Sequence, residues 1–328
     1  MATPLASLIG STVTFRIVTR LSSEIWWLLK EVVGGVGRHR VSMLAKQSAY
    51  SLIFAFPSLF IVLFSVAAIV DNRTEAGLSD ALLRLIDEKA PDELEPLLEH
   101  LVQHAIAEMS SSTAGLAALF SLLLAVWGVA GAVGTLIYAC NRVYGVADRR
   151  SYVARKLLTL ALTGIGGFLV AAAFVLFTFG RSIGEWVAES TDRQDILVQL
   201  VSNARPWAIA LVACTLLLLY ALAPDVELSM RWIVPGVAGV TGVITLASLG
   251  FEYLVRFVDP GSAYGAAGSV LILLWFLYLT SAIVVIGAEL NAALARRHDV
   301  KLTAFLARHP ERWLDRRPED GAKDPFGP

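Results

Sequence analysis

The chain alternates between long uncharged apolar runs and short polar segments. A helix needs about 20 mainly apolar residues to cross the ~30 Å hydrocarbon core of a bilayer. Six runs meet this requirement, at residues 45–70, 114–139, 157–180, 206–223, 232–255 and 264–290. The pattern therefore predicts an all-α fold, a polytopic transmembrane helical bundle with six spans.

Composition agrees with a membrane protein and excludes an ordinary soluble enzyme. The 328 residues are 56% hydrophobic and 17% charged, with a mean hydropathy of +0.65. Soluble domains carry about 45–50% apolar and about 25% charged residues. A net charge of −1 provides no basic field that would hold nucleic acid, so no nucleic-acid partner is expected. Membrane lipids are the expected surroundings.

The distribution of Lys and Arg predicts the orientation of the bundle. If each apolar run crosses the membrane, 20 basic residues fall on the side that holds both termini, and 7 fall on the other side. Basic residues accumulate in cytoplasmic loops. Both termini are therefore predicted to be cytoplasmic, in a multi-pass protein of the bacterial inner membrane.

The polar segments divide the chain into three parts. Residues 1–44 form a cytoplasmic or interfacial segment, in which 15–33 is predicted as an amphipathic helix with Trp26 and Trp27 at headgroup depth. Residues 45–292 form the six-helix membrane domain. Residues 293–328 form a cytoplasmic tail that becomes polar and proline-rich after Asp299, a composition typical of disorder.

The periplasmic loop 71–113 is the largest segment outside the predicted spans. It holds ten acidic residues, and its apolar residues recur at helical spacing from 92 to 109. This spacing predicts an amphipathic helix. Such a helix could simply cover the outer mouth of the bundle, or it could serve as a lid or bind a periplasmic protein partner.

Candidate catalytic chemistry is sparse. No glycine-rich phosphate loop or nucleophile elbow occurs, and we predict no catalytic, cofactor-binding or metal-binding residues, hence no enzyme and no cofactor. His100, His104 and Glu108 would share one helix face, but the metalloprotease pattern with its general base is absent. The other histidines are interpreted as solvated: His39, His298 and His309.

Polar residues at membrane depth are the better candidates, since lipid makes them costly. Glu289 is the residue most in need of a partner, and Lys46 or Arg142 is the expected one. The alternative is that these cations reach the headgroups unaided. The candidate functional cluster, all near the cytoplasmic ends of spans, comprises Lys46, Gln47, Asn141, Arg142, Glu289 and Asn291.

Small residues recur within the second, third and fifth spans, as at Gly128, Gly164 and Gly236. Small residues let helices approach closely in lipid, where packing drives their association. Close packing is the favoured interpretation, and hinges of a moving transporter are the alternative.

Three blocks of the chain resemble the YihY/BrkB membrane proteins. The first is the run AKQSAYSLIFAFP at 45–57. The second leads from Trp127 to NRVY at 141–144. The third joins YGAAG at 264–268 to LWFLY at 274–278 and GAELN at 287–291.

The resemblance spans about Arg40 to Arg297 and implies a bacterial inner-membrane protein with six spans. Members are often labelled ribonuclease BN, a label that these residues do not support. The leading hypothesis is a protein that moves a lipid, amphiphile or solute across or within the envelope. The alternative is a non-transporting envelope scaffold, and a membrane-bound ribonuclease is the least supported. The sequence leaves the oligomeric state open.

Overall fold

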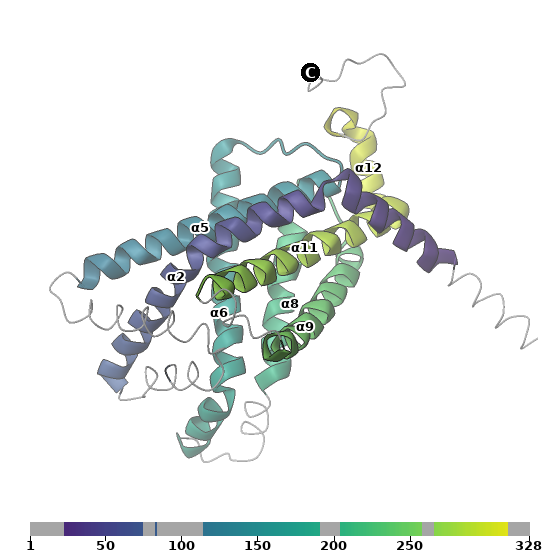
Figure 1. The fold of residues 1–328 in the computed structure, drawn as a ribbon. Helices are drawn as coiled ribbons and strands as arrows, with labels where there is room; N and C mark the ends of the chain where they lie inside the picture. Colours follow the sequence, from purple (N-terminus) through teal and green to yellow (C-terminus); the bar gives the residue numbers. More distant parts are fainter. Residues whose placement is uncertain (1–22, 75–82, 84–113, 191–203, 258–265, 314–328) are drawn as a thin grey trace, which may run out of the picture.

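The structure, a computed structural model, describes residues 23–74, 83, 114–190, 204–257 and 266–313. These residues form helices and no strands, which confirms the all-α prediction. A first helix covers residues 23–38. The long helices that follow are α2 (Val41–Thr74), α5 (Ala114–Val143), α6 (Tyr152–Ser190), α8 (Ala204–Leu222), α9 (Val234–Phe257) and α11 (Ala266–His298), and a short α12 (Val300–Arg308) comes last (Figure 1).

Five of the described helices are long and apolar enough to cross a membrane. Their candidate spans are Leu119–Val143, Tyr152–Leu176, Arg205–Leu222, Met230–Ala247 and Val270–His298. Each overlaps one of the six predicted spans. The remaining predicted span, 45–70, coincides with α2, whose side chains are described only in part, so its passage through the membrane stays a prediction.

We divide the long helices into two groups of three, and α9 of the second group also packs closely against α11 of the first. In the first group α2 lies along both α5 and α11, and in the second α6 lies along α8, which lies beside α9. The groups meet through α5 with α6 and through α9 with α11. Figure 1 shows α2, α5 and α11 running in similar directions across α6 and α8, with α9 slanted between the two directions. Hydrogen bonds between the groups lie at one shared end.

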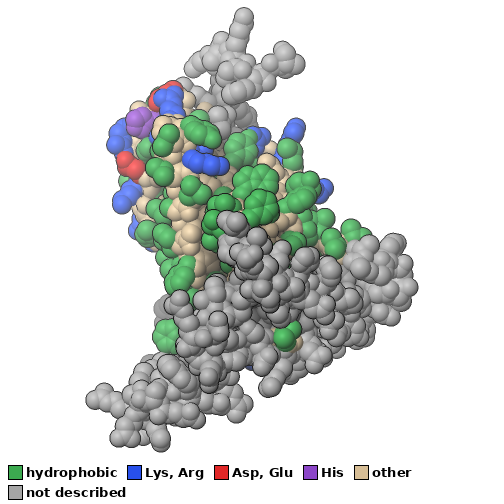
Figure 2. Space-filling view, turned by 90° about the vertical axis from the view of Figure 1, so that its left-hand side faces the viewer, with side chains coloured by type: hydrophobic (Ala, Val, Ile, Leu, Met, Phe, Trp, Pro, Cys, Tyr) green, Lys and Arg blue, Asp and Glu red, His purple; other side chains and the backbone are tan. Residues whose placement is uncertain are grey.

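We call the shared end the basic end: the starts of α2, α6 and α9 and the finishes of α5, α8 and α11. Charged side chains gather toward the upper end of the molecule in Figure 2, and hydrophobic side chains cover the described surface below them. This is the pattern that a bundle presents when one end stands in water and its flank in lipid.

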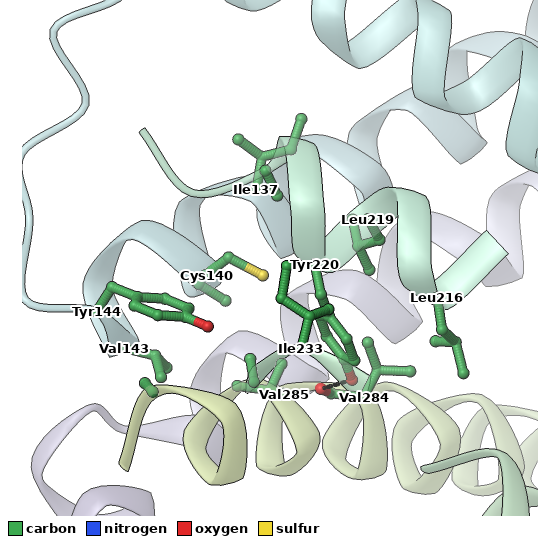
Figure 3. Packing of buried hydrophobic residues seen from close by; sticks show 14 of the residues in the cluster. Ile137, Cys140, Val143, Tyr144, Leu216, Leu219, Tyr220, Ile233, Val284 and Val285 are labelled. Carbon is green, nitrogen blue, oxygen red and sulfur yellow. Dashed lines mark hydrogen bonds between the residues drawn. The ribbon is translucent and has the colours of Figure 1, made fainter. Parts of the chain in front are cut away.

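The largest fully buried side chains among the described residues lie at the basic end. Figure 3 shows the buried side chains of Tyr144, Tyr220, Ile233 and Val285 converging from four different helical segments. The Tyr220 hydroxyl donates a 2.6 Å hydrogen bond to a backbone carbonyl of α11. A β-carbon at Gly287 would collide with Tyr220 and with a neighbouring valine of α9. Glycine is therefore required at that crossing.

The packing interpretation of the small residues holds at some positions only. A β-carbon at Gly128 would lie 2.7 Å from the β-carbon of Ala55, so α5 and α2 touch closely there. At Gly164 an added β-carbon would meet no described atom within 4 Å. That glycine faces outward, and contact with a neighbouring helix does not explain it.

The segment after residue 293 differs from the prediction of disorder as far as the description extends. α11 continues to His298, and Asp299 begins α12 by accepting a 2.9 Å hydrogen bond from the Lys301 amide. Asp299 also accepts hydrogen bonds of 2.7 and 2.8 Å from the amide and hydroxyl of Ser229. α12 buries Leu302 and one phenylalanine. Two apolar side chains on a nine-residue amphipathic helix hold the polar segment in place.

Candidate functional site

The six polar candidates all lie near the basic end, but they do not form one cluster. Three of them are buried, with exposed fractions of 3% for Asn141 and 0% for Glu289 and Asn291. Lys46 and Gln47 are exposed. The buried three make separate contacts, each of which joins two segments distant in the sequence.

Asn141 connects the end of α5 to the segment that follows α8. Its amide nitrogen donates to the carbonyls of Ile137 and Ala223, at 3.1 and 3.2 Å, and its oxygen accepts from the Asp225 amide at 2.8 Å. Every polar atom of the side chain is thereby satisfied. Asn141 fixes the position of a turn and has no free group for chemistry.

Arg150 completes the same junction. Its guanidinium donates to the carbonyls of Leu222, Ala223 and Pro224, at 3.0, 2.9 and 3.1 Å. The last carbonyls of a helix lack partners within the helix, and a cation there also complements the helix dipole. Arg150 was not among the predicted site residues. Its position in a run of basic residues gave no sign that it faces α8.

Asp225 is the carboxylate of this junction and was also missed. It lies 3.7 Å from Arg150 and forms an ion pair with Arg312, which arrives from the end of the described chain. Asn141, Arg150 and Arg312 therefore converge on one turn from three different segments. A network of this kind determines where the end of α8 lies relative to α5.

Asn291 joins α11 to α9. Its side-chain oxygen accepts a 2.7 Å hydrogen bond from the Gly236 amide, and a β-carbon at Gly236 would collide with the same side chain. The Gly236 amide belongs to the first turn of α9, where amides have no partner within the helix. Asn291 therefore caps α9 from a neighbouring helix.

Glu289 has a partner, but not one of the predicted cations. Its Oε1 lies 2.5 Å from Nδ1 of His39, and both side chains are buried. The prediction of Lys46 or Arg142 is wrong: Lys46 is exposed, and Arg142 reaches the Tyr138 hydroxyl at 3.4 Å. The interpretation of His39 as solvated is also wrong, because its side chain is buried against Glu289.

The first helix brings His39 to α11. Gly35 of that helix lies directly against the carboxylate, since a β-carbon there would be 2.5 Å from Glu289 Oε2. The His39 amide donates to the Gly35 carbonyl at 2.9 Å, and Arg40 then adopts φ = 52°. This left-handed residue ends the helix and lets α2 start in a new direction while His39 points inward.

Pairing lowers the electrostatic cost of burying His39 and Glu289. An imidazole and a carboxylate that share one proton carry no net charge, whichever of the two holds the proton. Either group alone, in its charged form, would be costly to bury. Among the described residues Oε2 of Glu289 has no hydrogen-bond partner. The pair can therefore act as an internal lock between the first helix and α11.

The described residues contain no group of three His, Cys, Asp or Glu side chains that could hold a metal ion. His100, His104 and Glu108, together with the predicted helix at 92–109, lie outside the described residues. The absence of a metal site at those positions stays a prediction.

Comparison with known proteins gives consistent results. The family described as "Virulence factor BrkB" matches residues 32–311. The ribonuclease-like protein YfkH of Bacillus subtilis (strain 168) is 25% identical over 272 residues, which cover 82% of this chain and 95% of YfkH.

UPF0761 membrane proteins of Xanthomonas campestris pv. campestris (strain B100) and of Xanthomonas oryzae pv. oryzae (strain PXO99A) are both 26% identical over 265 residues, 78% of this chain. The match covers 58% of each Xanthomonas protein, less than two thirds of its length. No solved structure matches the chain.

Proposed function

Because the chain belongs to the BrkB virulence-factor family, whose relatives include proteins named as membrane proteins, we propose that it moves a lipid or other amphiphile across the bacterial inner membrane. In this proposal it has six spans and two cytoplasmic termini, and it is not an enzyme. The basic end is then the cytoplasmic end.

The arrangement of the two helix groups is the observation that supports the proposal. The contacts between the groups that involve Tyr220, Asn141 and Asn291 all lie at the basic end. Two helix groups that meet at one end form an arrangement in which one group can rock against the other, as in alternating-access transporters.

Cysteine cross-links provide the test, in a variant that lacks the free Cys140 and Cys214. A β-carbon at Gly134 of α5 would lie 3.9 Å from a methyl carbon of Thr159 on α6. The two positions are therefore neighbours across the groups, and a disulfide between them requires their β-carbons to lie about 3.5–4.5 Å apart. The G134C/T159C pair would lock the two groups together at the basic end.

A matched control lies within one group. Ser48 of α2 and Ser281 of α11 have hydroxyl oxygens 3.3 Å apart, so S48C/S281C joins two helices that should move together. Both variants are reconstituted into liposomes, and movement of fluorescent lipid between leaflets is followed against empty vesicles. We expect oxidation to stop movement in G134C/T159C, and reduction to restore it, whereas S48C/S281C stays active. If oxidised G134C/T159C moved lipid as fast as oxidised S48C/S281C, the two groups would not need to move relative to each other. If neither variant moved lipid faster than empty vesicles, even when reduced, lipid transport would be contradicted.

Orientation is tested separately. A cysteine introduced near Arg149 should resist a membrane-impermeant thiol reagent in spheroplasts, whereas one placed within 71–113 should react. The opposite labelling would invert the proposed topology.

An envelope scaffold that binds a periplasmic protein through 71–113 is the alternative function, and that segment lies outside the described residues. Deletion of 71–113 separates the two proposals. A scaffold should lose its cellular role while purified protein shows no lipid movement before or after the deletion. For the ribonuclease label, purified protein is expected to leave RNA intact with or without zinc. Cleavage lost on substitution of His100 and His104 would overturn the non-enzyme proposal.

A further inference from the structure

An open hollow of about 550 Å³ lies on the surface of the basic end, where the first helix meets α2. It is lined by Val36, Gly37, Arg40, Ser42, Met43 and Lys46. Two of these side chains are cations, one is a hydroxyl, and two are apolar. Neither Arg40 nor Lys46 makes an ion pair or a side-chain hydrogen bond with another described residue. We propose that this hollow binds the headgroup of an anionic phospholipid, a site separate from any transport path.

Charge complementarity supports a phosphate ligand. Two other arginines at this end have carboxylate partners, Arg38 in Glu31 at 2.7 Å and Arg297 in Glu24 at 2.8 Å. Arg40 and Lys46 face the same hollow with no carboxylate among its lining residues. A phosphate is the ligand that guanidinium and ammonium groups bind with charge-assisted hydrogen bonds.

The backbone at Arg40 gives a second indication. Its φ of 52° is one that glycine adopts freely and that other residues adopt only at an energetic cost. Glycine stands close by in the chain, at Gly35 and Gly37, but arginine stands at the left-handed position. An arginine held there against its backbone preference is positioned for what its side chain binds.

The surface of α2 identifies the ligand as a lipid. Met43, Tyr50 and Phe54 are each more than half exposed. At 100° per residue they fall within about 40° of one another around the helix, so they form one apolar stripe that begins at the hollow. The rings of Tyr50 and Phe54 pack edge to face, with centroids 4.8 Å apart. A phosphate beside the cations would place an acyl chain along this stripe.

The depth of the hollow fits a headgroup. On the first helix the exposed Trp26 lies under the ammonium of Lys30, 5.1 Å from the ring centroid. Tryptophan and lysine are enriched where a membrane meets water. The hollow lies at the end of this same helix, and α2 then leads away from it as a mainly apolar helix.

The test measures binding of phosphatidylglycerol to the purified full chain in detergent, with melting temperature and a titrated dissociation constant as readouts. The test variant is R40N/K46Q, because asparagine tolerates the left-handed conformation. The control, K156Q/K301Q, removes the same charge from two exposed lysines outside the hollow. Since each basic side chain near an anionic membrane surface contributes about fivefold in affinity, binding should weaken about 25-fold in R40N/K46Q and stay within about twofold in the control.

Two other ligands and a third variant complete the test. Phosphatidylcholine and glycerol phosphate should each raise the melting temperature of the wild type far less than phosphatidylglycerol does. Equal stabilisation by glycerol phosphate would overturn the lipid assignment in favour of a soluble phosphate. R40G relieves the backbone strain, so it should melt at the same or a higher temperature without lipid and still lose the response to phosphatidylglycerol. An undiminished response in R40G and R40N/K46Q would overturn the site, even if lipid transport were established.

Discussion

Substitution of Glu289 tests how much the buried pair with His39 stabilises the packing of the first helix against α11. Glu289→Ala removes the carboxylate that lies against the buried His39 imidazole. Removal of one member of a buried pair costs about 3–5 kcal/mol, whereas an exposed pair contributes about 0–1 kcal/mol. At about 2–3 °C per kcal/mol for a chain of this size, the melting temperature should fall by about 6–15 °C.

The matched control is Glu227→Ala. Glu227 and Arg308 also form a close pair, at 2.9 Å, but their side chains are 55% and 57% exposed. Melting of the detergent-solubilised protein should change by no more than about 3 °C in this variant. Glu289→Gln keeps the shape and a hydrogen-bonding oxygen, so it should fall between Glu289→Ala and the wild type.

A double-mutant cycle distinguishes a direct pair from two independent burials. His39→Ala/Glu289→Ala should be less destabilising than the sum of the single variants, by about 1–3 kcal/mol, because the double variant leaves neither group unpaired. Additive losses, or a loss in Glu289→Ala as small as in the control, would refute the reasoning. An equal coupling of Glu289 to Lys46 would also refute it.

Three further predictions concern the same end of the bundle. Gly35→Ala should destabilise by about 1–3 kcal/mol, because the new methyl group would overlap the buried carboxylate, whereas Gly34→Ala faces open space in the same helix and should gain up to about 1 kcal/mol in unfolding free energy. Burial raises the pKa of Tyr144 well above its usual value of about 10, so its contribution to stability is complete below that pH and is lost as the pH rises past it. Tyr144→Phe should therefore reduce the loss of melting temperature between pH 8 and pH 11, and the exposed Tyr152→Phe should not. Arg150→Met should cost about 1–3 kcal/mol in unfolding free energy because it removes the side-chain donor to the Leu222 and Pro224 carbonyls, and unchanged melting would show that water satisfies them.

The length and polarity of the apolar runs were enough to predict helices, five of which are long and apolar enough to span a membrane among the described residues. These features depend on local properties, since about 20 apolar residues span a bilayer whatever their neighbours are. The same reasoning singled out Glu289, because an acidic side chain at membrane depth needs a partner.

The identity of that partner depended on tertiary structure. His39 lies 250 positions away in the chain. It reaches Glu289 because Gly35 leaves room for the carboxylate and because Arg40 adopts a left-handed conformation that no sequence pattern indicated. Lys46 had the right charge and a similar depth, but it projects from the exposed face of α2. Charge and depth can be read along a chain, whereas the direction in which a side chain points is determined by how the helices pack.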